Sequence, residues 1–234
     1  AGATVNDAAI AIVGGALRKY LQAHEELPDE SLAAMAPINV RSDKDETGGN
    51  IVSSMTVQVH SDITGPLQRL RAVHESTRDA KELTNAIGAK AMTDYTQFIP
   101  SMLTAQAARL ASRWHLMNRM TPQYNCVITN VPGPPMPLYN TGARMVASYG
   151  TGPVLDGLGL FHAIGSYCGQ FVISATSCRV MMPDPAFYRQ CLQDSFEELL
   201  AAAGTANRPR RKAARNKATS KQAARKKPTR KKAA

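Results

Sequence analysis

Basic residues gather at one end of this chain, and that segregation limits its fold more than any other feature of the sequence. Of the 28 Lys and Arg in 234 residues, 13 lie in residues 205–234, which contain no acidic residue. The first 204 residues therefore hold 15 bases against 18 acids. The basic segment has no large apolar side chain, so burial cannot offset the entropy lost on ordering it. We predict a folded domain over residues 1–203 and a disordered basic tail over residues 204–234.

Composition and cysteine spacing exclude several classes of protein. Hydrophobic residues make up 44% of the chain, which is enough for a core. The longest wholly apolar run has ten residues (8–17), whereas a membrane-spanning helix needs about 20. The four cysteines are widely spaced, which favours reduced core thiols in a cytoplasmic protein over a disulfide framework or a zinc site. The start at Ala1 is interpreted as that of a processed product or a fragment.

Helical and strand patterns mix along residues 1–203 and predict an α/β (α+β) body, with helices packed on a mixed sheet. A helix of about 18 residues is expected after Thr4, which caps it with Asp7 as the reciprocal partner. Three more helices are expected to begin near Pro66, Pro100 and Pro185. Strands are expected at 37–41, 51–60, 125–131, 143–150, 160–167 and 170–176, with a tight turn at Cys168-Gly169 between the last two.

Two apolar stripes at helical spacing predict buried helix faces. The helix after Pro100 is expected to bury Leu103, Ala107, Leu110, Trp114 and Met117 in the core. The last helix is expected to bury Tyr188, Cys191, Leu192, Phe196, Leu199 and Leu200.

The five histidines form no complete catalytic motif. None has an Asp four residues later, and the sequence contains neither a GxSxG elbow nor an HExxH zinc pair. His74 and His115 are predicted to lie on helix surfaces, and His162, on a strand, is predicted to be a structural histidine. From the residues alone, no general base is assigned.

Two pairs of polar residues are candidate site residues. Asn6 and Asp7 open the first helix, where free N–H groups and the helix dipole favour negative charge. They can orient a catalytic histidine or hold an oxyanion; alternatively, Asp7 caps the helix and Asn6 bonds the preceding loop. Thr129 and Asn130 end a strand before the proline-rich turn at 132–135. They can border a site or simply make turn hydrogen bonds.

Six segments, in order along the chain, resemble one known family. They are Thr4–Ala11, Pro37–Arg41 followed by Gly49-Asn50, Thr129–Tyr139 followed by Gly142–Arg144, Gly157–Leu160, Ser166–Gly169 and Pro183-Asp184. The segment 129–139, TNVPGPPMPLY, is the most specific of them. Together they resemble the C-terminal half of the bacterial wax ester synthase/diacylglycerol acyltransferases over about residues 1–203.

The resemblance implies a fold like that of chloramphenicol acetyltransferase, with two pseudo-equivalent halves around a tunnel. It implies acyl-CoA as co-substrate, diacylglycerol or a fatty alcohol as acceptor, and no bound cofactor or metal. In that family an HHxxxDG motif of the N-terminal half supplies the general base. Asn6 and Asp7 match its activity-linked ND motif, and Thr129 and Asn130 are expected nearest the tunnel. This chain has no HHxxxDG, so we expect it to be inactive without an N-terminal half, in the same chain or a separate one.

The tail is expected to bind a polyanion, either an anionic membrane or lipid-inclusion surface or a nucleic acid. No aromatic residue lies in residues 205–234, so base stacking is not expected. Two other functions remain open: a nucleic-acid-associated protein that reuses an inactive acyltransferase half, and a non-catalytic lipid-binding or scaffolding subunit. The expected location is the cytoplasm, with peripheral attachment to membranes or lipid inclusions left open. A lone half should also expose the apolar surface that meets its partner.

Overall fold

The computed structural model describes residues 2–39, 52–87, 101–114 and 122–206, so the tail beyond residue 206 lies outside the described residues. The helices are α1 (Val5–Ala23), α2 (Pro66–Ile87), α4 (Ser101–Arg113) and α5 (Pro185–Ala206). The strands are β1 (Ala33–Asn39), β2 (Val52–Gln58), β3 (Cys126–Val131), β4 (Tyr139–Asn140), β5 (Ala143–Arg144), β6 (Leu160–Tyr167) and β7 (Gln170–Ser177). These elements confirm the α/β class. Within the described ranges, no helix has the length and hydropathy needed to cross a membrane.

Five strands form one mixed sheet in the order β2-β1-β3-β6-β7. The central pairs β1–β3 and β3–β6 are parallel, and the outer pairs β1–β2 and β6–β7 are antiparallel. The β6–β7 turn lies at Cys168 and Gly169, whose φ angles of 49° and 79° match the predicted tight hairpin. Strand β1 begins four residues before the predicted strand at 37–41, of which residues 40 and 41 lie outside the described part.

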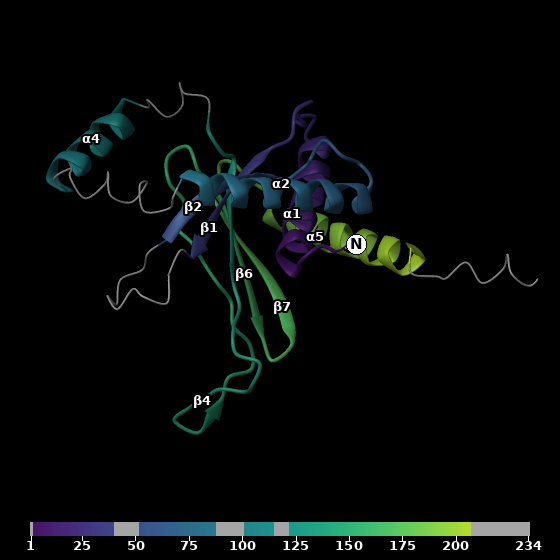
Figure 1. Ribbon diagram of the computed structural model, residues 1–234. Coiled ribbons are helices and arrows are strands. Elements are labelled where there is room, and N and C mark those ends of the chain that lie inside the picture. Colours follow the sequence, from purple (N-terminus) through teal and green to yellow (C-terminus); the bar gives the residue numbers. More distant parts are fainter. Residues whose placement is uncertain (1, 40–51, 88–100, 115–121, 207–234) are drawn as a thin grey trace, which may run out of the picture.

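Helices α1, α2 and α5 pack together against one face of this sheet (Figure 1). The core joins apolar residues of these helices to alternate residues of the strands, such as Cys126, Ile128, Leu160 and Ile164. Helix α1 is buried on almost all sides from Ala9 to Leu17, as expected of a helix that is apolar all round. It contacts both α2 and α5, and α2 also contacts β2 directly.

Two adjacent glycines let α1 approach its neighbours this closely. A Cβ at Gly14 would lie 2.0 Å from the carbonyl oxygen of Val59, and one at Gly15 would lie 2.2 Å from Arg69 Nη1 and from Ser195 Oγ. At Gly14 the contact is with backbone, so no side chain fits there without separating the elements, whereas a side chain at Gly15 would have to displace those of Arg69 and Ser195. The pair therefore sets how tightly α1 packs against the backbone after β2 and against α2 and α5.

The opposite face of the sheet carries the segment 145–157. A Cβ at Gly150 would lie 2.6 Å from that of Ala163, and one at Gly152 would lie 2.3 Å from the ring of Phe161, so this segment runs close over β6. The strand predicted at 143–150 is wrong beyond Arg144, because only β5 pairs with a neighbour there. Val146 and Tyr149 are apolar but 83% and 73% exposed, so apolar composition alone did not make a strand.

The prediction that the helix near Pro100 buries its apolar stripe is also wrong for the residues that can be checked. Leu110 is 47% exposed and Trp114 is 61% exposed. Helix α4 lies apart from the other helices (Figure 1). Periodicity tells which residues share a face but not what covers that face. No described element covers this one.

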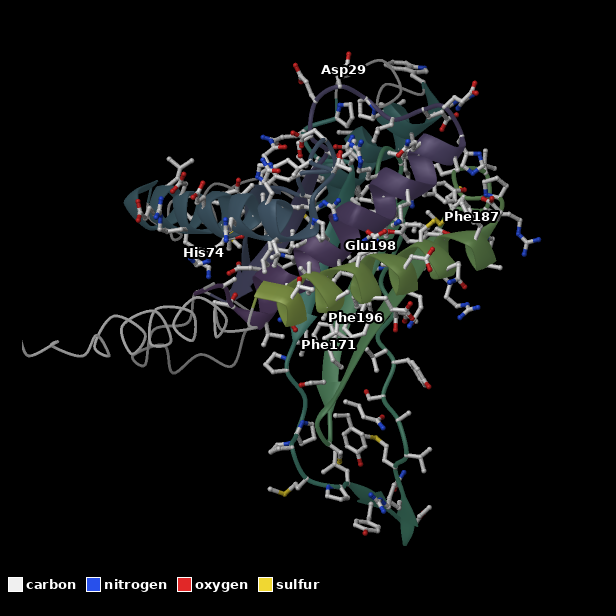
Figure 2. The ribbon with its side chains drawn as sticks, turned by 90° about the vertical axis from the view of Figure 1, so that its right-hand side faces the viewer. Asp29, His74, Phe171, Phe187, Phe196 and Glu198 are labelled. Atoms are coloured by element: carbon white, nitrogen blue, oxygen red, sulfur yellow. The ribbon has the colours of Figure 1, made fainter. Side chains whose placement is uncertain are left out.

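Helix α5 is rotated relative to its predicted face. Tyr188, Cys191 and Leu199 are buried as expected, but Phe196 is 45% exposed and Leu200 is 60% exposed. Phe196 and Phe171 of the edge strand β7 instead line an open groove of about 420 Å³ (Figure 2). The helix ends at Ala206, beyond the predicted domain boundary at residue 203.

Candidate active site at the start of helix α1

The start of α1 is closed by a reciprocal capping box. The Asp7 backbone N–H donates to Thr4 Oγ1 at 3.2 Å, and the Thr4 backbone N–H donates to Asp7 Oδ2 at 2.8 Å. Capping by Asp7 is therefore confirmed. The box orients the Asp7 carboxylate toward the interior, where its side chain is 1% exposed.

A histidine from another helix completes the environment of Asp7. His74 extends from α2 (Figure 2), and its Nδ1 lies 2.8 Å from Asp7 Oδ2. A carboxylate oxygen only accepts, so His74 donates from Nδ1. Burial alone raises the pKa of Asp7, but the hydrogen bonds from the Thr4 backbone and from His74 outweigh it, and the pKa lies below its ordinary value. Asp7 thus stays ionised inside the protein.

The second carboxylate oxygen has no such partner. Among the described side chains, Asp7 Oδ1 and Thr77 Oγ1 are the buried polar atoms without a hydrogen bond. Thr77 lies one turn beyond His74 on α2. A buried polar atom without a hydrogen bond costs about 1–3 kcal/mol, and here one such atom lies on α1 and the other on α2.

The end of β3 brings an amide to the same place. Asn130 Nδ2 donates to Asn6 Oδ1 at 3.5 Å, a long hydrogen bond that links β3 to the first turn of α1. This bond occupies the Asn6 carbonyl oxygen. Both N–H groups of the Asn6 amide remain for another acceptor, and Asn6 is only half-buried. The structure therefore brings Asn6, Asp7, His74 and Asn130 together.

Thr129 lies on the other face of the sheet. Successive side chains of a strand point to opposite faces, so Thr129 turns away from the helices while Asn130 turns toward them. Thr129 lines a cavity of about 300 Å³ beneath the segment 145–151, together with Phe161 and Gly165 of β6. The two residues expected nearest a tunnel thus face different environments.

His162 is a structural residue, as predicted. It is fully buried, with Nδ1 3.3 Å from the carbonyl oxygen of Val127 and Nε2 2.7 Å from the hydroxyl of Tyr188. The carbonyl can only accept, so Nδ1 carries the proton and Nε2 accepts from Tyr188. Burial lowers the pKa of His162 to about 4, so the ring is neutral at pH 7.

His74 is the site residue that sequence reasoning missed. It was predicted to lie on the surface of its helix, and its side chain is indeed 37% exposed. It follows Val73 and stands four residues after Leu70, both buried, so it lies at the edge of the apolar face of α2. This position at the edge of an apolar face was the feature of the sequence that could have pointed to a partly buried role for His74. Its pairing with a residue 67 positions away was not visible in the sequence.

Comparison with known proteins gives a consistent set of relatives. Residues 48–200 match the family model described as the WS/DGAT C-terminal domain. Rv1760 of Mycobacterium tuberculosis H37Rv, named as a diacylglycerol O-acyltransferase, is 34% identical over 199 residues, which cover 85% of this chain and 39% of the relative. Rv3740c of the same strain has the same kind of name and is 35% identical over 205 residues, which cover 87% of this chain and 44% of the relative.

A solved structure is similar over the same part of the chain. The wax ester synthase/diacylglycerol acyltransferase from Marinobacter aquaeolei VT8 matches with a TM-score of 0.67 and 27% identity, covering 87% of this chain and 44% of that one. The chain therefore spans about two-fifths of the length of the relatives that it matches.

Proposed function

The chain belongs to the wax ester synthase/diacylglycerol acyltransferase family, and on that premise we propose that it is the C-terminal part of an acyl-CoA-dependent O-acyltransferase. The reaction joins a fatty acyl group to diacylglycerol or to a fatty alcohol, giving triacylglycerol or a wax ester. The observation that carries the proposal is the convergence of Asn6, Asp7, His74 and Asn130 at the start of α1, within a chain of this family.

In the proposed reaction, the acceptor hydroxyl loses its proton to a general base, and its oxygen attacks the thioester carbonyl carbon. The carbonyl oxygen becomes an oxyanion until the C–S bond breaks and the thiolate of CoA takes up the proton. The base belongs to the HHxxxDG motif of an N-terminal half, because this chain has no such motif. The part assigned to this chain is stabilisation of the oxyanion.

Asn6 is the proposed oxyanion donor. Asn130 Nδ2 donates to the side-chain carbonyl oxygen of Asn6. This hydrogen bond directs the side-chain N–H groups of Asn6 away from β3. The N-terminal end of α1 adds a partial positive charge at the same place. Asp7 and His74 are positioning residues in this proposal, because they fix the first turn of α1 on which Asn6 lies.

Thr129 is proposed to border the substrate tunnel. The cavity that it lines carries further hydroxyl groups, those of Ser148, Tyr149 and Thr151, beside the apolar ring of Phe161. Such a mixture of apolar surface and a few polar groups suits the aliphatic part of an acyl or acceptor chain.

An N-terminal half is the proposed partner of the open groove between β7 and α5. Phe171 and Phe196 lie in it side by side, and β7 is the edge strand of the sheet (Figure 2). An exposed edge strand beside exposed aromatic rings is typical of a surface that another domain covers.

The tail is proposed to hold the enzyme at an anionic membrane or lipid-inclusion surface.

The test is to join this chain to the N-terminal half of the Rv1760 relative and to measure ester formation from radiolabelled acyl-CoA. We expect no turnover from the chain alone and turnover from the fusion. The control is the same fusion with the histidines of the HHxxxDG motif that the family leads us to expect in that half replaced by Ala, which should be inactive. Turnover by the chain alone would contradict the proposed division of labour between the halves.

A further inference from the structure

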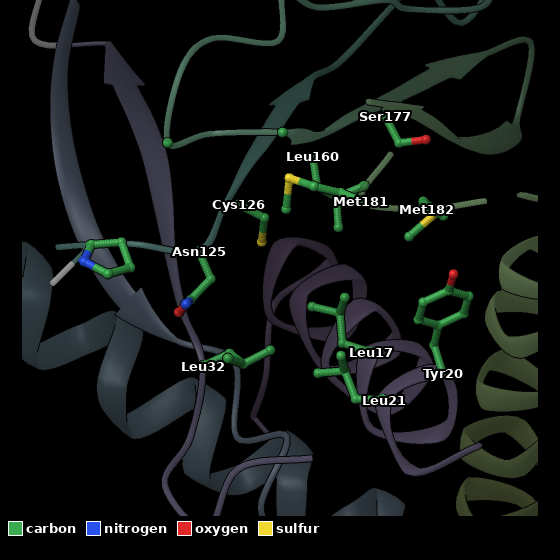
Figure 3. Close-up of a pocket in the computed structure, with 13 residues that line it drawn as sticks. Leu17, Tyr20, Leu21, Leu32, Asn125, Cys126, Leu160, Ser177, Met181 and Met182 are labelled. Carbon is green, nitrogen blue, oxygen red and sulfur yellow. The ribbon is translucent and has the colours of Figure 1, made fainter. Parts of the chain in front are cut away.

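A second apolar pocket lies at the end of the sheet away from Asn6 and Asn130. Its volume is about 240 Å³ (Figure 3). It is lined by Leu17 and Leu21 of α1 and by the residues at which β3 and β6 begin, Cys126 and Leu160. Asn130, by contrast, lies near the end of β3. Leu17 lies ten positions after Asp7 on α1, which is about 15 Å along the helix.

The core fills the space between the two places. Ile10 and Val13, on the intervening turns of α1, are 1% and 0% exposed and belong to the hydrophobic core. These side chains occupy the buried face of α1 between this pocket and Asn6. The pocket is therefore a place in the fold distinct from the acyl-transfer site proposed beside Asn6.

The lining offers a ligand little polarity and no charge. None of the described residues that line the pocket carries an ionised side chain. Burial raises the pKa of the Cys126 thiol to about 12, so it is neutral. The Tyr20 hydroxyl donates to the carboxylate of Asp184, and Asn125 Oδ1 accepts from the backbone of Ala33 at 2.9 Å. Water would find few partners here.

Two methionines form the wall opposite α1. Met182 is buried at 5% exposure, whereas Met181 is 58% exposed and lies at the rim. A Cβ on Gly159 would lie 1.9 Å from Met181 Sδ, so this glycine leaves the space that the thioether occupies. Methionine side chains are unbranched and adapt to flexible ligands. The pocket exceeds the roughly 150 Å³ of an engineered apolar cavity that binds benzene.

We propose that this pocket binds the unbranched aliphatic chain of a neutral lipid, such as a long-chain alcohol, at a site separate from the acyl-transfer site. The leucines hold the chain on the side of α1, and Met181 and Met182 close over it. A charged headgroup would have to remain in solvent, because the lining holds no counter-ion. The site follows from the lining alone and stands independently of the acyltransferase proposal.

The test uses the full 234-residue chain, labelled with ¹³C at the methionine methyl groups, and a series of primary alkanols from butanol to decanol. The methyl signals of Met181 and Met182 should shift on binding, while that of Met55, buried in β2, should stay. Each added methylene should lower Kd about fourfold until the pocket is full. Shifts at Met55 alone, or none at all, would overturn the proposal.

A matched pair of variants locates the binding. Leu21→Trp should fill the pocket and weaken decanol binding at least tenfold, whereas Leu200→Trp, on an exposed position of α5, should leave it unchanged. Met181→Ala, at an exposed rim position, should weaken binding severalfold without the risk of unfolding the protein. An unchanged Kd in both pocket variants would show that the alkanol binds elsewhere and would overturn the proposal. None of these readouts depends on ester formation.

Discussion

His74 Nδ1 lies 2.8 Å from Asp7 Oδ2, and this hydrogen bond joins the first turn of α1 to the middle of α2. The carboxylate that receives it is 1% exposed and also accepts from the Thr4 backbone. A single buried carboxylate thus closes the end of one helix and fixes its contact with another. Asn6, beside Asp7, takes its orientation from this arrangement and from Asn130.

The ionised form of Asp7 should make stability depend on pH. Its pKa in the folded protein is lowered from the ordinary value of 3.8, so its contribution is complete above that value and is lost as the pH falls through the folded pKa. We expect Asp7→Asn to cost about 1–3 kcal/mol at pH 7 and to flatten the loss of stability below about pH 4. Urea unfolding of both proteins at several values between about pH 2.5 and about pH 7 measures this. Parallel pH curves would contradict it.

Two substitutions at His74 can distinguish the effect of its hydrogen bond to Asp7 from the effect of the packing of its ring. The side-chain amide of His74→Asn can place an N–H near the position of Nδ1, so we expect it to keep most of the stability. His74→Leu has no donor, leaves the Asp7 carboxylate with one partner fewer, and should cost about 1–2 kcal/mol. Thermal unfolding compares the two. Equal losses would show that His74 acts by packing and not by donating to Asp7.

Asn6 should matter for turnover and not for folding. In the fusion that carries an N-terminal half, Asn6→Ala should lower kcat about a hundredfold or more, the usual effect of losing an oxyanion donor. Asn130→Ala, which only frees the Asn6 carbonyl oxygen, should lower it less. The Asn6→Ala, Asp7→Ala double variant should be inactive. A folded double variant with normal turnover would rule out the proposed role.

The close approach at Gly14 should be intolerant of any side chain. A Cβ there would lie 2.0 Å from the backbone carbonyl oxygen of Val59, so we expect Gly14→Ala to destabilise the protein by more than about 3 kcal/mol. Gly204 is the matched control, since it is also helical and a Cβ added to it would meet nothing within 4 Å. Gly204→Ala should be neutral or stabilising by up to about 1 kcal/mol. Chemical denaturation of the two variants and of the unchanged protein measures both changes in the free energy of unfolding.

Residues 207–234 should bind anionic surfaces by charge alone. Deleting them should abolish binding to vesicles that contain phosphatidylserine, and binding by the intact chain should fall steeply with salt. Vesicles of phosphatidylcholine alone are the control. Binding of duplex DNA in the same assay, stronger than that of the anionic vesicles at equal salt, would favour the nucleic-acid function over attachment to a lipid surface.

Much of the fold could be predicted because it is encoded locally. The capping box at Thr4 and Asp7, the hairpin at Cys168-Gly169 and the helix start at Pro185 depend on neighbours within a few residues, and all three are present. The strand expected at 143–150 failed because a strand needs a partner, and hydrogen-bonded pairing is not a local property.

The sequence by itself determined the family, the order of the main helices and strands, and the capping box of Thr4 and Asp7, since motifs and caps are written in consecutive residues. Tertiary structure decided that His74 meets Asp7, that Asn130 and not Thr129 faces Asn6, and that Leu110 and Trp114 lie exposed. The physical reason is the same in each case. Periodicity fixes which side chains share a face, but the packing of distant elements determines what each face meets.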